Sequence, residues 1–228
     1  AWACTIGGNV AENAGGKRAV LWGTAIDNLL RFRIAVPGGR LLEVRRMHPT
    51  GRRIGADESI SFSVADSIDQ QQIKQIHIQG RQLRKPGLGK DITNKALEGL
   101  PGVQKEGTDG IITSAVFMLH KAYPHQGTVC LEFFGEDMDE AGLVIARISR
   151  AFVNRGREAL MALEHFDEEY VQAIDYKAKA PRSQSPKAVL LIDIVGHTPE
   201  QVDTGLSRLR ALLSAYPDTY MAVARDEQ

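Results

Sequence analysis

A glycine-rich segment near the start of the chain has the composition of a ligand-binding loop. Ile6–Gly16 contains four glycines, two alanines and two asparagines in eleven positions. Glycine accepts positive φ and lets a backbone come within contact distance of a ligand, and asparagine tolerates left-handed conformations. A loop of this kind exposes main-chain N–H groups with little side-chain bulk, which suits a large flat or anionic ligand. The same composition also occurs in mobile surface loops that bind nothing.

Two further segments follow this one in a fixed order. Pro37-Gly38-Gly39-Arg40 joins two apolar runs, and residues 106–113 read Glu-Gly-Thr-Asp-Gly-Ile-Ile-Thr before an apolar run to Leu119. Together, over about 120 residues, the three segments resemble the FAD-linked oxidases, whose FAD-binding domain is shared by the vanillyl-alcohol oxidase and p-cresol methylhydroxylase group. Either glycine motif alone would be a weak signal.

The resemblance implies a cofactor and the residues that hold it. In that family a loop like Ile6–Gly16 runs along the flavin, and a segment like 106–113 closes the FAD site. The implied contacts are backbone N–H groups at small residues and an apolar wall beside them. The implied FAD-binding residues are Gly7, Gly8, Asn9, Ala14, Gly15, Gly16, Gly110, Ile111 and Ile112. For Ile111 and Ile112 the competing interpretation is simple core packing, because apolar residues that begin a strand usually point inside.

The resemblance also implies an activity. The chain would belong to an FAD-dependent oxidoreductase that oxidises a small 2-hydroxy acid such as lactate or glycolate by hydride transfer to flavin. The electron acceptor is not identified. Residues 85–93 and 99–107 resemble one bacterial subgroup of large dehydrogenases that carry an iron–sulfur module further downstream. Since Cys4 and Cys130 alone cannot hold a four-thiolate cluster, any such cluster is expected outside this sequence.

Several departures from the family indicate a piece of a longer protein. The sequence has no initiator Met, and the family's first phosphate-cradling loop would lie upstream of Ala1. The His and Glu residues that the hydroxy-acid branch uses on its substrate are expected beyond Gln228, so the catalytic residues stay unknown. Asp109 stands where the family usually has Leu, which leaves the local packing open. We therefore expect half a cofactor site and no catalytic base.

Bulk composition excludes several classes of protein. The 228 residues are 43% hydrophobic and 25% charged, with a formal net charge of zero, which is ordinary for a globular protein. Zero net charge gives no electrostatic reason to expect a nucleic-acid partner. No apolar run approaches the roughly 20 residues of a transmembrane helix. The two cysteines are expected to be buried thiols in a reducing compartment, which indicates the cytoplasm.

The histidines and lysines offer no site of their own. A zinc site needs three or four convergent ligands, and the sequence assembles none, so no metal is predicted. The histidines are interpreted as structural. The lysines of the central region are interpreted as part of a solvated basic loop; the alternative is that they offer positive charge to FAD phosphate or to a substrate carboxylate. These residues are His120, His125, His165 and His197, and Lys85, Lys90, Lys95 and Lys105.

Hydrophobic periodicity predicts the elements of the first half. Strands are expected over Leu29–Val36 and Leu41–Arg45, and an antiparallel hairpin over Ser59–Val64 and Ile73–Ile78, with one buried face. This hairpin, at about residues 56–80, is interpreted as an insertion into the FAD-type domain. A short helix over Asp91–Leu97 and a strand over Ile111–Leu119 complete this half.

After Pro124 strands and helices alternate. The predicted helices and strands form a βαββαβ layout, a ferredoxin-like plait with its helices on one face of the sheet. A loop is expected over Lys177–Lys187, which is rich in Pro, Ser and Lys. The predicted elements are a strand at Thr128–Phe134, a helix at Asp137–Asn154, a strand at Ala159–Phe166, a helix at Glu168–Lys177, a strand at Ala188–Val195 and a helix at Pro199–Ala215.

The predicted fold class is therefore α+β. Residues 1–126 are interpreted as the C-terminal half of a p-cresol methylhydroxylase-type FAD-binding domain, and residues 127–228 as the ferredoxin-like start of the cap domain. Two other functions remain open. A nucleotide- or NAD-binding enzyme is disfavoured because neither Gly-x-Gly-x-x-Gly nor a P-loop Lys-Ser/Thr is present. A non-catalytic interaction module with a degenerate FAD-type fold is the main alternative.

Overall fold

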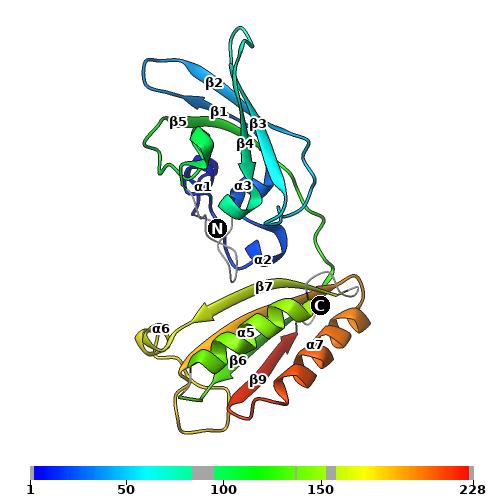
Figure 1. Cartoon of the computed structure of the whole chain (residues 1–228). Helices are drawn as coiled ribbons and strands as arrows, with labels where there is room; N and C mark the ends of the chain where they lie inside the picture. Colours follow the sequence, from blue (N-terminus) through cyan, green and yellow to red (C-terminus); the bar gives the residue numbers. More distant parts are fainter. Residues whose placement is uncertain (1–2, 84–94, 137, 153–157, 226–228) are drawn as a thin grey trace. The chain divides into compact units, whose positions relative to one another are not determined.

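The chain forms two compact units, each with its own antiparallel sheet (Figure 1). The computed structural model describes residues 3–83, 95–136, 138–152 and 158–225. The first unit covers Ala1–His120 and the second covers Lys121–Gln228. This mixture of helices with two antiparallel sheets confirms the predicted α+β class.

The first unit is built on a five-stranded sheet in the order β4-β3-β2-β1-β5. Its strands are β1 (Leu29–Ala35), β2 (Leu41–Met47), β3 (Ser59–Asp66), β4 (Gln72–Gln79) and β5 (Ile111–Phe117). A tight turn at Pro37 and Gly38 connects β1 to β2, and Gly38 supplies the positive φ of 90° that this turn needs. The strands therefore follow the predicted positions closely.

The hairpin of β3 and β4 pairs as predicted. Ile60 lies opposite Ile78 and Phe62 lies opposite Ile76 in the antiparallel register, and all four side chains are buried. Ile73 is the exception, with 45% of its surface exposed. Because Ile73 and Ile76 are an odd number of residues apart, a strand's two-residue period sends them to opposite faces.

One face of this sheet carries the core of the first unit. Its fully buried large side chains include Phe32 and Ile34 of β1 and Phe62 of β3. The strand β5 is an edge of the sheet and is poorly covered. Ile111 is 73% exposed and Val116 is 40% exposed, so apolar side chains lie along this edge.

Short helices cover the ends of the core, and one of them lies in the segment that was predicted to be a glycine-rich loop. They are α1 (Ile6–Ala11), α2 (Ala19–Trp22), α3 (Ala25–Asn28), α4 (Gly80–Leu83) and the 3₁₀ turn η1 (Leu97–Gly99). The prediction that Ile6–Gly16 is a loop throughout was wrong, because its first half is α1. The N-cap Thr5 accepts a hydrogen bond from the Gly8 N–H at 3.0 Å, and Val10 is fully buried. The helix expected over Asp91–Leu97 falls mostly outside the described residues.

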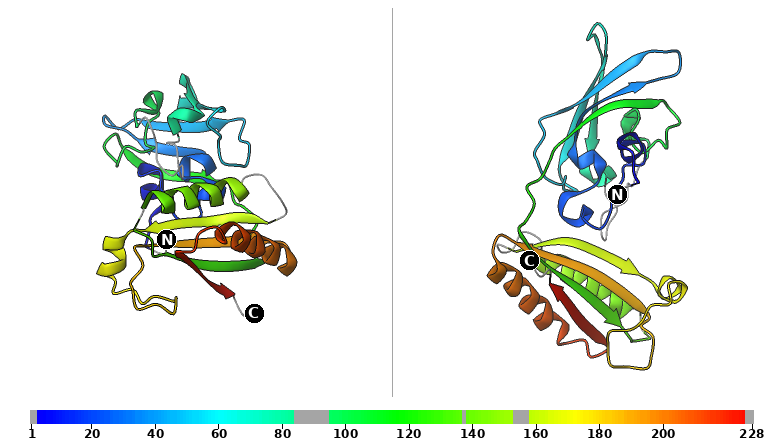
Figure 2. Two further views of the ribbon diagram at one scale, coloured as in Figure 1. Left: turned by 60° about the horizontal axis from the view of Figure 1, so that its bottom comes forward. Right: turned by 180° about the vertical axis from the view of Figure 1, so that it is seen from behind.

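The second unit is a ferredoxin-like plait, as predicted. Its elements are β6 (His125–Phe133), α5 (Met138–Phe152), β7 (Ala159–Phe166), α6 (Glu168–Ala173), β8 (Ala188–Gly196), α7 (Pro199–Leu213) and β9 (Thr219–Arg225). The strand order β7-β8-β6-β9, with every pair antiparallel, is that of a βαββαβ plait. The two long helices, α5 and α7, lie on one face of this sheet (Figures 1 and 2).

Apolar stripes hold both long helices on the sheet. Along α5 the buried residues are Ala141, Val144, Ile148 and Phe152, and along α7 they are Val202, Gly205, Leu206, Leu209 and Leu213. Thr198 caps α7 by accepting a hydrogen bond from the Gln201 N–H, and Pro199 occupies the first turn. The helix predicted over Glu168–Lys177 is shorter than expected, because α6 ends before Asp175, which has a positive φ of 49°.

A buried carboxylate fixes the long loop of the second unit to its sheet. Glu132 on β6 is fully buried. Its side chain accepts hydrogen bonds from the Tyr176 hydroxyl at 2.8 Å, the Lys179 N–H at 2.6 Å and the Ala180 N–H at 2.8 Å. Burial raises the pKa of Tyr176, and its hydrogen bonds to Cys130 and Glu132 raise it further. The phenol therefore stays protonated and remains a donor.

Glu132→Gln should destabilise the second unit by about 1–3 kcal/mol, because one acceptor oxygen becomes an NH₂ group that faces a donor. Urea unfolding followed by circular dichroism measures the loss, and hydrogen exchange should rise at Lys179 and Ala180. Glu169→Gln, at an exposed position on α6, is the control and should change stability by less than about 0.5 kcal/mol. Equal stabilities for the two variants would show that the Glu132 contacts are dispensable.

Candidate functional site

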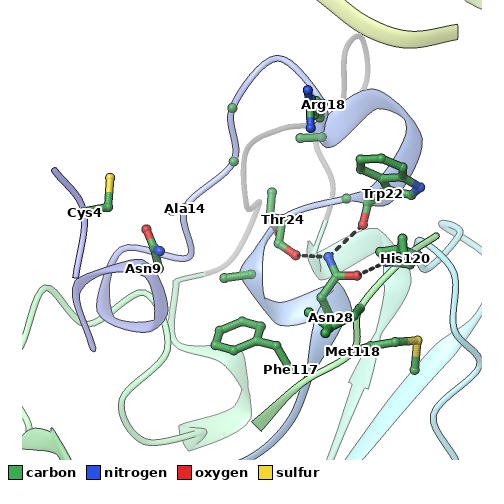
Figure 3. A pocket seen from close by; sticks show the side chains of 16 residues that line it. Cys4, Asn9, Ala14, Arg18, Trp22, Thr24, Asn28, Phe117, Met118 and His120 are labelled. Atoms are coloured by element: carbon green, nitrogen blue, oxygen red, sulfur yellow. Dashed lines mark hydrogen bonds between the residues drawn. The ribbon is translucent and has the colours of Figure 1, made fainter. Parts of the chain in front are cut away.

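A pocket of about 540 Å³ lies in the first unit, beside the glycine-rich segment (Figure 3). Its walls come from α1, the segment up to α2, α3 and the residues that follow β5. The lining residues are Cys4, Asn9, Ala14, Gly15, Gly16, Arg18, Ala19, Trp22, Gly23, Thr24, Ala25, Asn28, Phe117, Met118, Leu119 and His120. This volume is typical of small-molecule sites.

Asn28 organises one wall of the pocket. Its amide nitrogen donates to the carbonyl oxygens of Trp22 at 2.9 Å and Thr24 at 3.0 Å. The amide oxygen is thereby left to face His120, whose Nε2 lies 2.6 Å away. Because a carbonyl oxygen can only accept, His120 must carry a proton on Nε2. Asn28 thus fixes both the orientation and the tautomer of the imidazole.

The same imidazole stacks on an indole ring. The ring centroids of Trp22 and His120 are 5.3 Å apart and the planes differ by 7°. Figure 3 shows these two side chains above Asn28, on the same side of the pocket. The pair presents a flat aromatic surface, which is the shape that suits a planar ligand.

A buried carboxylate holds the turn that carries these residues. Asp27 is 1% exposed. It accepts hydrogen bonds from the Thr24 N–H at 2.7 Å, the Thr24 hydroxyl at 3.2 Å and the Ile54 N–H at 2.9 Å. Gly23 precedes this turn with a φ of 76°, and a Cβ there would lie 2.1 Å from the Asp27 carboxylate. Only glycine fits this position without displacing Asp27.

The opposite wall consists mainly of backbone. Asn13 accepts a hydrogen bond from the Ile26 N–H at 2.8 Å, and the Ala14 carbonyl accepts one from the Ala25 N–H at 2.9 Å. These bonds place Gly15 and Gly16 in an irregular segment next to α3. Within the described part of the chain their N–H groups have no acceptor. A Cβ on Gly16 would meet nothing within 4 Å, so the backbone there is open to a ligand.

The structure brings together some of the predicted cofactor residues and separates others. Asn9, Ala14, Gly15 and Gly16 line the pocket, whereas Gly7, Gly8, Gly110, Ile111 and Ile112 do not. A Cβ on Gly7 would lie 3.6 Å from the Ile112 side chain, so these two positions adjoin each other.

Gly110, the residue just before β5, is closely surrounded by its neighbours. A Cβ on Gly110 would lie 2.5 Å from the Ala35 carbonyl oxygen. Ile112 packs against the core, as its competing interpretation expected. Asp109 accepts a hydrogen bond from the Gly102 N–H at 2.8 Å through one carboxylate oxygen, while its other oxygen is buried without a hydrogen-bond partner in the described part of the chain.

Four residues of the pocket were not predicted from the sequence as cofactor-binding residues. Arg18, Trp22 and Asn28 follow the glycine-rich segment at spacings that match no motif, and His120 lies far away in the chain. Arg18 is exposed at the pocket, and within the part of the chain that the structure describes its guanidinium forms no ion pair. His120 is a hydrogen-bonded structural histidine, as predicted, and it also lines the site.

Two other expectations concern cysteines and metals. The expectation of two buried thiols was wrong, because Cys4 is exposed at the pocket and Cys130 is half-buried. Cys4 lies just before the cap of α1 and so outside the core.

Among the described residues no cluster of three or more His, Cys, Asp or Glu side chains could hold a metal ion. Within the same residues no helix has the length and apolar character to cross a membrane.

Comparison with known proteins shows a shared fold. No family model and no curated protein sequence matches the chain. Two structures of alkyldihydroxyacetonephosphate synthase align with 96% and 95% of it, at TM-scores of 0.54 and 0.52 and 16% identity. A VAO-type flavoprotein from Myceliophthora thermophila aligns with 97% of it, at a TM-score of 0.48 and 15% identity. The chain spans about a third of these proteins, 34%, 33% and 30% of their lengths. The fold expected from the FAD-linked oxidase resemblance is thus confirmed.

Gly23→Ala should destabilise the first unit by about 2–4 kcal/mol, because positive φ is strained for alanine and the new Cβ displaces the Asp27 carboxylate. Thermal unfolding followed by Trp fluorescence measures this loss. Gly16→Ala is the control, with open space at Cβ and no positive φ, and should stay within about 0.5 kcal/mol. A Gly23→Ala protein as stable as the control would contradict the close contact with Asp27.

Proposed function

We propose that this chain is part of an FAD-dependent oxidoreductase and that the pocket around Asn28 holds part of the FAD. One observation carries the proposal. The segment Ala14–Gly16, implicated from its sequence, lines a pocket with free backbone N–H groups and a flat aromatic wall. The fold shared with alkyldihydroxyacetonephosphate synthase supports it.

The residues of the pocket fit a flavin dinucleotide. FAD has a flat tricyclic ring with polar edges and an anionic pyrophosphate. The N–H groups of Gly15 and Gly16 would donate to its oxygens, and the small side chains there allow close approach. The stacked pair of Trp22 and His120 would contact a ring, and the exposed Arg18 would supply positive charge beside an anionic group.

Each wall of the pocket would contribute a separate function. Bound FAD supplies the hydride acceptor that the side chains of proteins lack. Asn28 accepts the Nε2–H of His120, which would fix the orientation of the ring beside a ligand and leave that N–H unavailable to it. Phe117 and Met118 would exclude water from one side. No residue here is assigned as a catalytic base.

Finer assignments are proposals that rest on the sequence resemblance. Residues 1–126 would be the second half of the FAD-binding domain, and residues 127–228 the start of the cap domain. The substrate would be a small 2-hydroxy acid, oxidised at its CH–OH group in a dehydrogenase of the bacterial cytoplasm, with an iron–sulfur cluster elsewhere in the protein. Gly7, Gly8 and Gly110–Ile112 would contact FAD only if the cofactor extends past the pocket towards β5.

The chain of 228 residues should bind FAD weakly or not at all, because the phosphate-cradling loop would lie outside it. Each lost charge-assisted hydrogen bond removes about 1.5–3 kcal/mol. Losing three or four therefore weakens binding by several powers of ten, since about 1.4 kcal/mol is tenfold. Titration followed by flavin fluorescence measures this affinity. Tight stoichiometric binding would show that residues 1–126 suffice.

A chain extended upstream through a phosphate-cradling loop should purify yellow, with the visible absorbance bands of bound flavin. In that protein Trp22→Ala should weaken FAD binding about five- to a hundredfold, because base–aromatic stacking contributes about 1–3 kcal/mol. Tyr123→Ala is the matched control, since Tyr123 also contacts a histidine ring, that of His197, with centroids 4.9 Å apart and planes tilted by 35°, but does not line this pocket. A colourless extended protein would favour the non-catalytic interaction module instead.

A further inference from the structure

The outer face of the first sheet, which points away from the core, carries a cluster of arginines. Side chains alternate between the two faces of a strand, and Phe32 of β1 and Val44 of β2 are buried in the core. Arg31, Arg33 and Arg45 are their neighbours in the sequence, so they lie on the opposite face, where Arg31 and Arg45 are exposed. We call these three residues the arginine face.

One acid lies among these arginines and is shared by two of them. Glu43 is 4% exposed, and it accepts hydrogen bonds from Arg33 Nε at 3.1 Å and from Arg45 Nη2 at 2.9 Å. Burial opposes the ionisation of this carboxyl, but the hydrogen bonds from Arg45 and Arg33 and the charge of Arg31 outweigh burial and lower the pKa of Glu43. Three cations therefore surround one carboxylate, and two positive charges remain unbalanced.

Two of the arginines repel each other. Arg31 and Arg45 lie directly opposite one another in the register of β1 and β2, and like charges at such positions destabilise a sheet. Arg45 shares Glu43, whereas Arg31 forms no ion pair within the residues that the structure describes. Ser63 of β3 and the half-exposed Val116 of β5 flank the pair in the same row across the sheet. A flat row of this kind suits another protein, since small ligands bind in concave pockets.

The two units of the chain carry opposite net charges. Ala1–His120 contains 16 Lys and Arg and 11 Asp and Glu, whereas Lys121–Gln228 contains 12 and 17. With histidine neutral, the formal charges are +5 and −5, although the whole chain is neutral. The exposed acids of the second unit include Glu136, Glu169 and Glu200. Each copy of the chain thus offers acidic groups that complement the arginine face of another copy.

We propose that the arginine face binds the acidic second unit of another copy of this chain. A carboxylate from that copy would bridge Arg31 and Arg45 in the way that Glu43 bridges Arg33 and Arg45, because one guanidinium has donors for more than one carboxylate. This contact would offset the repulsion between Arg31 and Arg45 and cover Val116. Nucleic acid suits the arginine face less well, since affinity for phosphates grows with the number of cations that contact them.

Sedimentation velocity of the 228-residue chain at low and high salt tests the proposal. The chain should associate in about 0.01 M sodium chloride and dissociate in about 1 M, because the Debye length falls from about 30 Å to about 3 Å. At low salt, hydrogen exchange should slow with rising chain concentration in β1 and β2 and also in the second unit. Association that persists in the high salt, or protection confined to the first unit, would overturn the proposal.

The double variant Arg31→Gln, Arg45→Gln should weaken this association about two- to thirtyfold, the change that corresponds to the loss of two exposed ion pairs. Arg31→Gln alone should act in the same direction, and it breaks no ion pair within the described part of the chain. The matched control is Arg52→Gln, Lys95→Gln, which removes two charges from side chains that are 61% and 62% exposed, as Arg45 is 60% exposed. The control should associate as the unmodified chain does.

A chain that is monomeric at both salt concentrations would overturn the proposal. Saturable binding of a glutamate peptide by that monomer would assign the arginine face to an acidic partner protein instead. Equal association of the double variant and its control would overturn it as well, because the contact would then not involve Arg31 and Arg45. None of these results affects the FAD proposal.

Discussion

The buried carboxylate of Asp27 joins separate segments of the first unit. Asp27 closes the turn at Thr24, binds the N–H of Ile54 from a segment after β2, and lies at the end of the turn that carries Asn28. Removing it would leave several buried donors without acceptors. The consequence reaches the candidate site, because Asn28 follows Asp27 directly and sets the orientation of His120. The same residue also meets Arg46 through its main-chain oxygen. The candidate site therefore depends on Asp27, although Asp27 does not line the pocket itself.

Sequence patterns predicted the parts of the fold that regular burial controls. Strands and long helices repeat their apolar residues with a fixed period, so β1, β3 and the stripes of α5 and α7 were placed correctly. The error at Ile73 arose where the apolar spacing departed from two. The short helix α1 was missed, since its glycines have low helix propensity. Its N-cap at Thr5 is a local hydrogen bond to Gly8, and the burial of Val10 depends on tertiary packing.

The candidate site was predictable only in part. Composition indicated Asn9 and Ala14–Gly16, because small residues and exposed backbone are visible in a sequence. The aromatic wall was not predictable, because Trp22 and His120 are almost a hundred residues apart and meet only when β5 returns beside β1. The arginine face was hidden for another reason. Nothing in the run Glu-Val-Arg-Arg-Met shows which of its two arginines points towards the core.

The open edge of β5 has a consequence for how this chain behaves in solution. An edge strand presents unpaired N–H and C=O groups in a row, and proteins normally protect such rows with charges, proline or a covering segment. Here the row carries Ile111 and Val116 instead, and Leu119 just beyond it is 91% exposed. Exposed apolar side chains on an edge strand are the type of surface at which the sheets of separate chains pair. A charged residue in place of Val116 would oppose such pairing, because its charge would have to leave water when two sheets meet.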